Sequence, residues 1–164
     1  MKKSILLFLP LFALLVLFSC KKSSKSSINT VGTITATIDG NQQTFNVGAT
    51  AQLQNNGGSN SLSIIGVQGS GNSNSLIMLV TNNGPITTGT YTGADSKANL
   101  SYTTTNSLIY QNDDSDVNSN ATIVISSITS TNVQGTFSGK LVLITGNGAA
   151  TATITSGTFN LAVQ

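Results

Sequence analysis

The chain has 164 residues, of which only 7% are charged: seven cationic and five acidic side chains, with no histidine. It also lacks arginine, glutamate and tryptophan, and its single cysteine is Cys20. These absences exclude a Ser-His-Asp triad, a glutamate pair and a zinc site of the usual kinds. Nucleic-acid binding needs clustered cations to neutralise phosphates, and the domain has none. We therefore expect no enzyme, no cofactor, no metal and no nucleic-acid partner.

The first twenty residues have the layout of a secretory signal. Lys2 and Lys3 precede an apolar run over residues 5–18, and Ser19 stands directly before Cys20. A membrane-spanning helix needs about 20 apolar residues, so this run has the length of a signal peptide instead. The segment resembles the signal of bacterial lipoproteins, in which the cysteine thiol receives a diacylglycerol. We predict a cleaved signal over 1–19 and lipidation of Cys20, which also explains a lone exported thiol.

The positive net charge of the chain arises mainly from lysines that precede the domain. Residues 20–30 are polar and lysine-rich, which predicts a flexible tether that follows the lipidated cysteine. Beyond residue 30 only Lys97 and Lys140 remain against all five aspartates, so the domain itself is mildly acidic.

Residues 31–164 form one compositional block and are expected to fold as one all-β domain. Threonine and β-branched residues favour strands, and short polar turns separate them. The clearest hairpin joins Thr33–Ile38 to Gln42–Val47 through Asp39-Gly40-Asn41, whose residues tolerate positive φ angles. The other expected strands are 50–54, 61–68, 75–81, 88–92, 101–104, 108–111, 121–128, 132–144 and 150–163, with a hairpin loop at 146–148.

About ten antiparallel strands in this length predict a two-sheet β-sandwich. Residues 76–80 are apolar on both alternating faces, which indicates a central strand that is covered on both sides. This interpretation places one sheet over the other, with the apolar faces between them.

A Gly-Thr-aromatic motif occurs three times, ending in Tyr91, Phe137 and Phe159. We expect each aromatic ring to pack inward beside a close strand approach at its glycine. In the last copy, Ala152 and Ile154 are out of phase with Phe159, Leu161 and Val163. A one-residue bulge at Ser156-Gly157 would bring all five onto the core face.

Several of these strings together resemble small Bacteroidota-type lipoproteins of unknown function. They are the lipoprotein signal, Thr35-Ala36-Thr37-Ile38-Asp39-Gly40, Gly89-Thr90-Tyr91, Gly135-Thr136-Phe137-Ser138 and residues 154–160. The resemblance implies a β-sandwich-like domain on a lipid anchor at the outer membrane, and no activity. In such lipoproteins surface display is associated with acidic residues after the cysteine, which Lys21-Lys22-Ser23 lacks. We therefore expect a domain that faces the periplasm.

One polar-aromatic grouping is a candidate for a weak binding loop: Tyr102, Tyr110, Asp113, Asp114, Asp116 and Asn118. The spacing of Asp114, Asp116 and Asn118 is that of the first oxygen ligands of a calcium loop. The rest of such a loop is missing, since Ser119 replaces the glycine and Ile125 replaces the bidentate carboxylate. A solvated hairpin tip is the competing interpretation.

Two functional hypotheses follow. The first is a membrane-anchored, non-catalytic binding module that presents its loops to a glycan or a protein. The second is a structural or protein-interaction lipoprotein without a small ligand. Exposure of Tyr102 and Tyr110 beside the aspartates would favour the first, because sugar-binding platforms need exposed aromatic rings.

Overall fold

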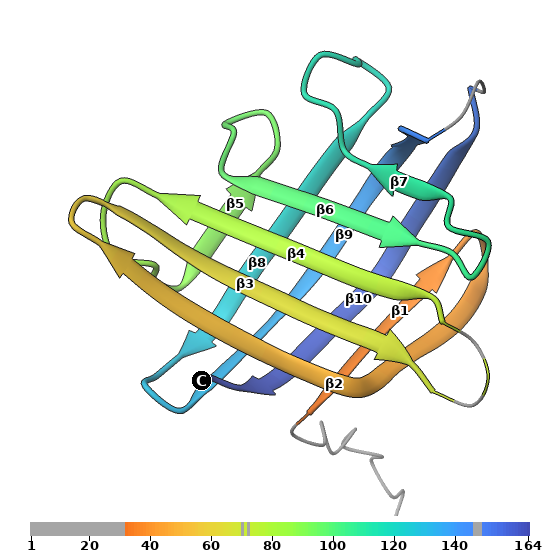
Figure 1. The fold of residues 1–164 in the computed structure, drawn as a ribbon. Helices are drawn as coiled ribbons and strands as arrows, with labels where there is room; N and C mark the ends of the chain where they lie inside the picture. Colours follow the sequence, from red (N-terminus) through yellow and green to blue (C-terminus); the bar gives the residue numbers. More distant parts are fainter. Residues whose placement is uncertain (1–31, 70, 72, 146–148) are drawn as a thin grey trace, which may run out of the picture.

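The computed structural model describes residues 32–69, 71, 73–145 and 149–164, and the elements in these ranges are all β-strands. Figure 1 shows their arrangement. The ten strands are β1 Thr33–Ile38, β2 Asn41–Asn56, β3 Ser59–Gln68, β4 Ser75–Asn82, β5 Gly89–Thr92, β6 Ala98–Thr103, β7 Ile109–Gln111, β8 Asn120–Ile128, β9 Asn132–Leu143 and β10 Thr151–Ala162. The all-β class is therefore confirmed.

The two-sheet sandwich is wrong, because the sheet closes on itself. Eight strands form a ring of pairings in the order β1-β2-β3-β4-β6-β7-β9-β10, and β10 returns to β1. The pairing of β7 with β9 is the shortest in the ring, with Tyr110 opposite Leu143 and Gln111 opposite Val142. The rest of that edge of β9 pairs with β8, which carries β5 on its far side. The fold is a closed barrel with two additional strands.

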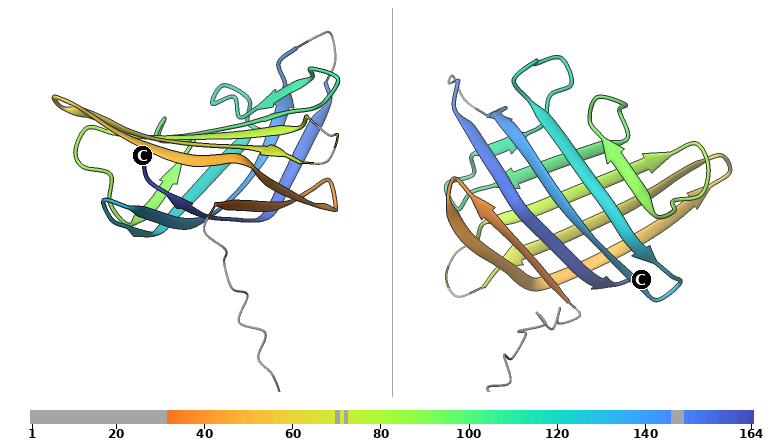
Figure 2. Two further views of the ribbon diagram at one scale, coloured as in Figure 1. Left: turned by 60° about the horizontal axis from the view of Figure 1, so that its bottom comes forward. Right: turned by 180° about the vertical axis from the view of Figure 1, so that it is seen from behind.

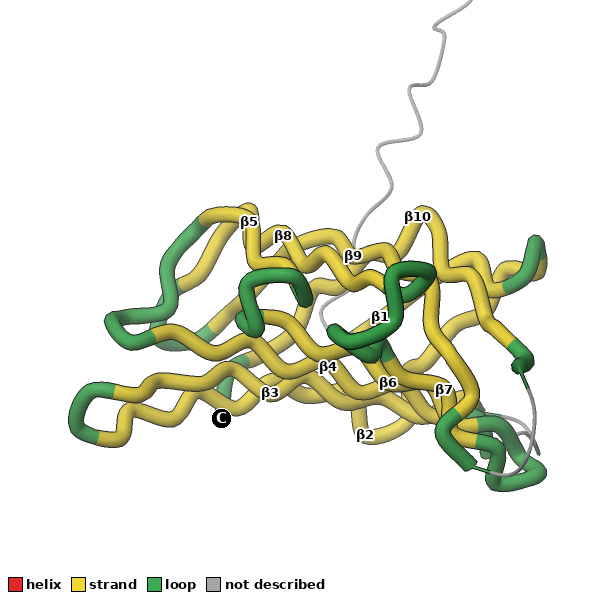
Figure 3. Tube along the Cα trace, turned by 90° about the horizontal axis from the view of Figure 1, so that it is seen from above, coloured by secondary structure: helices red, strands yellow, loops and turns green. Residues whose placement is uncertain are grey.

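The barrel is flattened into two layers, which explains why the sequence suggests a sandwich. Figures 2 and 3 show β1, β5, β8, β9 and β10 in one layer and β3, β4 and β6 in the other. Strand β2 passes between the layers: its first half pairs with β1 and its second half with β3. Its register shifts between Phe45 and Thr50, where Gly48 has a φ of 59°. Two predicted strands, 42–47 and 50–54, are thus one bent strand.

The first hairpin forms as predicted. Asp39 and Gly40 have φ angles of 48° and 81°, as a two-residue turn between twisted strands requires. The Asp39 carboxylate also accepts a hydrogen bond from the Thr153 backbone N–H at 2.8 Å, and Asp39 donates its own N–H to the Thr153 carbonyl at 2.9 Å. The turn is therefore fixed to the neighbouring strand β10.

Inward-facing apolar side chains fill the barrel. The largest fully buried ones are Phe45, Phe159, Ile34, Leu62, Ile64, Leu76, Met78, Leu100, Ile123, Ile125, Leu141 and Ile154. The prediction that β4 is covered on both faces is wrong, since Ile77 is 39% exposed and Leu79 is 37% exposed. Only one face of a barrel strand meets the interior, and the other face of β4 lies on the outer surface, where both side chains stay exposed.

The last two copies of the Gly-Thr-aromatic motif pack against each other across β9 and β10. Phe159 lies opposite Gly135, and Phe137 lies opposite Gly157, so each ring covers the other strand's glycine. A Cβ at Gly157 would lie 2.5 Å from the Phe137 carbonyl oxygen and 2.7 Å from its ring. This close approach, which we call the β9–β10 seam, confirms the inward packing expected for Phe137 and Phe159. Tyr91 is buried as well.

The predicted bulge is also confirmed. The β9–β10 register shifts between Ile154 and Gly157, and the residue in a left-handed conformation is Ser156, with a φ of 51°. The bulge shifts the alternation of inward-facing side chains by one residue, as expected. Side chains on both sides of it therefore face the core: Ala152, Ile154, Phe159 and Leu161 are buried, and Val163 is half-buried against the core.

Three features predicted for the start of the chain lie outside the described residues: the signal over 1–19, the lipidated Cys20 and the tether over 20–30. The loop expected at 146–148 lies outside them too. In the part of the chain that the structure describes, no helix has the length and apolar character needed to cross a membrane.

Candidate functional site

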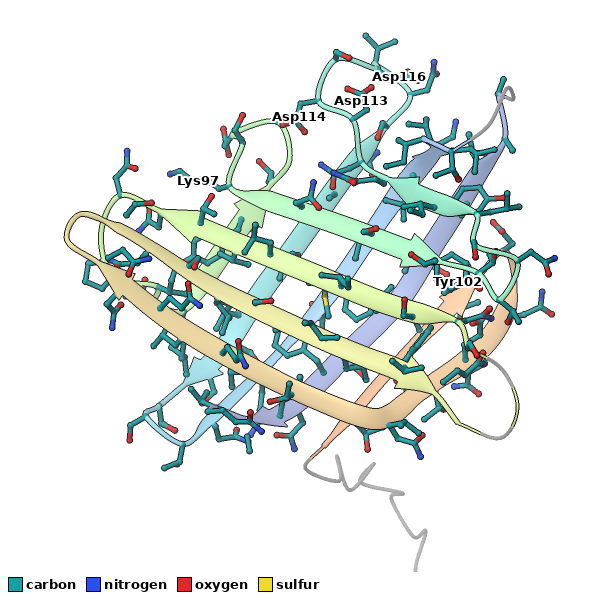
Figure 4. The ribbon with its side chains drawn as sticks, in the orientation of Figure 1. Lys97, Tyr102, Asp113, Asp114 and Asp116 are labelled. Atoms are coloured by element: carbon teal, nitrogen blue, oxygen red, sulfur yellow. The ribbon has the colours of Figure 1, made fainter. Side chains whose placement is uncertain are left out.

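The β7–β8 loop, residues 112–119, carries the polar residues singled out from the sequence. Figure 4 shows Asp113, Asp114 and Asp116 on this loop at one end of the barrel, with Lys97 at the same end in the β5–β6 connection. β1 begins at the opposite end, near the C-terminus (Figure 1). We call the end that carries the loop the charged rim.

The carboxylates of the loop hold its backbone in place. Asp113 Oδ1 accepts hydrogen bonds from the Ser115 N–H at 2.9 Å and the Ser115 hydroxyl at 2.6 Å. These two bonds, the hydroxyl first, lower the pKa of the Asp113 carboxyl from its usual 3.8. Asp116 Oδ1 accepts the Asn118 N–H at 2.8 Å. Each carboxylate thus uses one oxygen in a local turn, as aspartates commonly do.

Asn112 joins the loop to the barrel, and sequence reasoning missed it. Its side chain, 6% exposed, accepts the Leu100 N–H at 2.6 Å and donates to the Ala98 carbonyl at 3.3 Å and to Asp114 Oδ1 at 3.1 Å. The amide thereby extends the β6–β7 ladder past the end of β7. The sequence offers little signal for this role, because an asparagine beside a polar run has the composition of an ordinary loop.

The two tyrosines do not join the aspartates. Tyr102 and Tyr110 lie opposite each other on β6 and β7, with ring centroids 6.2 Å apart, and Tyr102 is only 6% exposed. The Tyr102 ring also meets Phe45 edge-on at 6.4 Å, and its hydroxyl donates to Gln43 Oε1 at 3.4 Å. Figure 4 places Tyr102 away from the labelled aspartates. The tyrosines therefore offer no exposed aromatic platform beside the loop.

A cavity of about 490 Å³ lies between the β7–β8 loop and the ends of β9 and β10. We call it the rim cavity. Its polar lining includes Asp113, Asp116, Asn118 and Lys140, and its apolar lining includes Val142 and Ala150. Lys140 was not among the candidate binding residues, and it reaches this cavity because it faces outward on β9, opposite Asn120 of β8. A second cavity, of about 480 Å³, lies on the other side of the loop against Asn99 and Gln111.

The rim does not form a metal centre from carboxylates alone. Among the described residues no three acidic, histidine or cysteine side chains are grouped so that they could hold a metal ion. The chemistry that the arrangement offers is recognition of charge and of hydrogen-bonding groups.

Comparisons with known proteins return no relative. No protein-family model matches the chain, and neither a curated protein nor a solved structure matches it significantly.

Proposed function

We propose that this chain is a lipid-anchored lipoprotein of the cell envelope whose barrel is a non-catalytic binding module. The signal pattern and Cys20 support a lipid anchor at the outer membrane, and the lysine-rich tether supports a domain that faces the periplasm. Several acyl chains on one cysteine suffice for stable anchoring, whereas one chain is marginal.

The position of the charged rim is the observation that carries the binding role. Strand β1 begins at one end of the barrel, and the loop with Asp113, Asp114 and Asp116 lies at the other (Figure 4). A domain tethered through β1 therefore presents its charged groups away from the anchor. The interior is filled by apolar side chains, so binding falls to the rim and the outer surface. The partner would be a glycan or a protein that the rim meets in the envelope.

The anchor can be tested on the full-length chain expressed in a Bacteroidota host. We expect mass spectrometry to find a mature N-terminus at lipidated Cys20, and we expect the protein to partition into detergent. The variant Cys20→Ala should lose the lipid. An unmodified Cys20, or residues 1–19 retained in the mature protein, would contradict the proposal.

The second candidate function is a structural or protein-interaction lipoprotein, and the outer face of β3 and β4 favours it. Ile65 and Ile77 lie directly opposite each other there and are 37% and 39% exposed. Thr50, opposite Ile65, has a buried hydroxyl without a hydrogen-bond partner among the described residues. Exposed apolar residues that adjoin one another are typical of protein contact surfaces.

A photo-reactive side chain distinguishes the two candidates in intact cells. Placed at Ile77, it should cross-link a protein partner if the β3–β4 face is the contact surface. Placed at Asn118, it should cross-link the partner or the glycan if the rim is the binding site. Cross-linking from position 77 alone would favour the second candidate over the first.

A further inference from the structure

The rim cavity is lined by charges of both signs that come from separate elements. Asp113 and Asp116 reach it from the β7–β8 loop, and Lys140 reaches it from β9. Between them lie aliphatic surfaces, among them those of Val142 and Ala150. Asp113, Asp116 and Lys140 are each partly exposed, so a ligand in the cavity can reach them from solvent.

These opposite charges do not neutralise each other inside the protein. In the described residues no lysine ammonium lies within 4.0 Å of a carboxylate. Asp113 and Asp116 each use Oδ1 for the loop, and no hydrogen bond of the described residues occupies their Oδ2 atoms. The Lys140 side-chain ammonium likewise has no partner there, although its backbone is held by Asn120 and Ser119. Three charged groups thus line one cavity and remain available to a ligand.

Charge complementarity defines the ligand. Two carboxylates match two ammonium groups, one lysine matches one carboxylate, and the aliphatic lining matches a methylene chain between them. A volume of about 490 Å³ admits a small molecule of this kind. The lysine in the same cavity disfavours a bare metal ion, which it would repel.

We propose that the rim cavity binds two ammonium groups and one carboxylate of a single small ligand, either a free diamino acid such as lysine or ornithine, or a short peptide with an amino-terminal lysine whose carboxyl-terminal carboxylate supplies the negative charge. This inference rests on the proposed role of the barrel as a binding module and gives that module a ligand class. Asp113 and Asp116 hold the two ammonium groups, and Lys140 holds the carboxylate.

Three related ligands test each charge separately. The full-length chain, purified from membranes in detergent micelles, is titrated calorimetrically with lysine, with norleucine, which lacks the second ammonium, and with cadaverine, which lacks the carboxylate. A charged hydrogen bond contributes about 1.5–3 kcal/mol, so we expect lysine to bind at least about tenfold more tightly than either analogue. Equal affinities for the three ligands, or no binding of lysine at millimolar concentration, would overturn the proposal.

Three variants assign the charges to residues. Asp113→Asn and Asp116→Asn each keep an oxygen that accepts the loop hydrogen bonds, and one of the two variants, the one at the side-chain ammonium, should lower the preference for lysine over norleucine about tenfold. Lys140→Met keeps the aliphatic stem and removes the preference for lysine over cadaverine. Asp95→Asn is the matched control, because Asp95 is a carboxylate of the β5–β6 loop that does not line this cavity, and it should change neither preference. Losses that do not follow this pattern would contradict the assignment.

The source of the ligand follows from a fourth titration, with a dipeptide that carries an amino-terminal lysine. In this ligand the carboxylate lies one residue further from the ammonium groups. Tighter binding of free lysine indicates a free amino acid, and tighter binding of the dipeptide indicates a peptide terminus. An unlipidated chain that binds lysine would contradict the anchor alone, whereas a lipidated chain without lysine binding would contradict this inference alone.

Discussion

The β9–β10 seam and the β7–β8 loop are built from similar small and polar residues, yet they are stabilised in opposite ways. At the seam Gly135 and Gly157 contribute by having no side chain, since each is covered by an aromatic ring of the neighbouring strand. In the loop the side chains of Asp113, Asp116 and Asn112 supply the hydrogen bonds that the backbone lacks. The comparison shows that residues of similar composition can form both a tightly packed strand pair and a polar loop. The β9–β10 seam leaves no room for a side chain at its glycines, whereas the β7–β8 loop depends on hydrogen bonds from its side chains.

The largest effect is expected where an added side chain breaks the seam. Gly157→Val places a Cβ against the Phe137 carbonyl and ring, which the β9–β10 pairing cannot move apart. We expect the free energy of unfolding, measured by urea denaturation, to fall by about 3 kcal/mol, the upper part of the range for overpacking. Gly84→Val is the control, because a Cβ at Gly84 would only approach the Asn82 side chain, at 3.7 Å. An unchanged unfolding curve for Gly157→Val would remove the seam argument.

The next largest effect is expected at Asn112, whose buried side-chain amide connects the β7–β8 loop to the barrel. Asn112→Ala leaves the Leu100 N–H and the Ala98 carbonyl without the side-chain partner that they have in the barrel. An unsatisfied buried group costs about 1–3 kcal/mol, so we expect a loss of roughly 2 kcal/mol in the same measurement. Asn118→Ala, on the exposed part of the loop, should cost far less. Similar losses for both variants would show that Asn112 is an ordinary loop residue.

A smaller effect is expected at the bulge, where Ser156 has a φ of 51°. A β-branched residue is strained in this conformation, so Ser156→Val should lower the free energy of unfolding by about 1–2 kcal/mol. Glycine adopts the conformation freely, and Ser156→Gly should leave stability equal or slightly higher. If both substitutions reduce stability alike, the left-handed backbone at Ser156 is not the cause.

The smallest expected effect is a pH dependence, which should be present in the β7–β8 loop and absent from the β9–β10 seam. Hydrogen bonds from Ser115 lower the pKa of Asp113, so what they contribute is present above pH 3.8 and is lost as the pH falls through the lowered pKa. The Ser115 amide resonance should therefore titrate with a midpoint below pH 3.8, and the seam amides should not follow it. Asp113→Asn should abolish the transition. A midpoint at or above 3.8 would contradict the role of these hydrogen bonds.

The local features of the fold could be predicted from the amino-acid sequence. Asp39-Gly40-Asn41, whose residue types tolerate positive φ, predicted the first hairpin, and a break of alternation in residues 150–163 located the bulge at Ser156-Gly157. These features depend on near neighbours in the chain, so residue types that tolerate positive φ and the alternation of apolar side chains are enough to locate them.

The closure of the sheet and the grouping of the polar residues could not be predicted from the sequence and became clear from the three-dimensional structure. A sandwich and a barrel bury the same alternating side chains, so the pairing of β10 with both β1 and β9 leaves no mark on periodicity. The same limit applies to the rim, where Lys140 joins Asp113 and Asp116 while Tyr102 turns into the core. Such contacts join residues far apart in the chain, and they depend on strand order and register, which the hydrophobic pattern of a single strand does not specify.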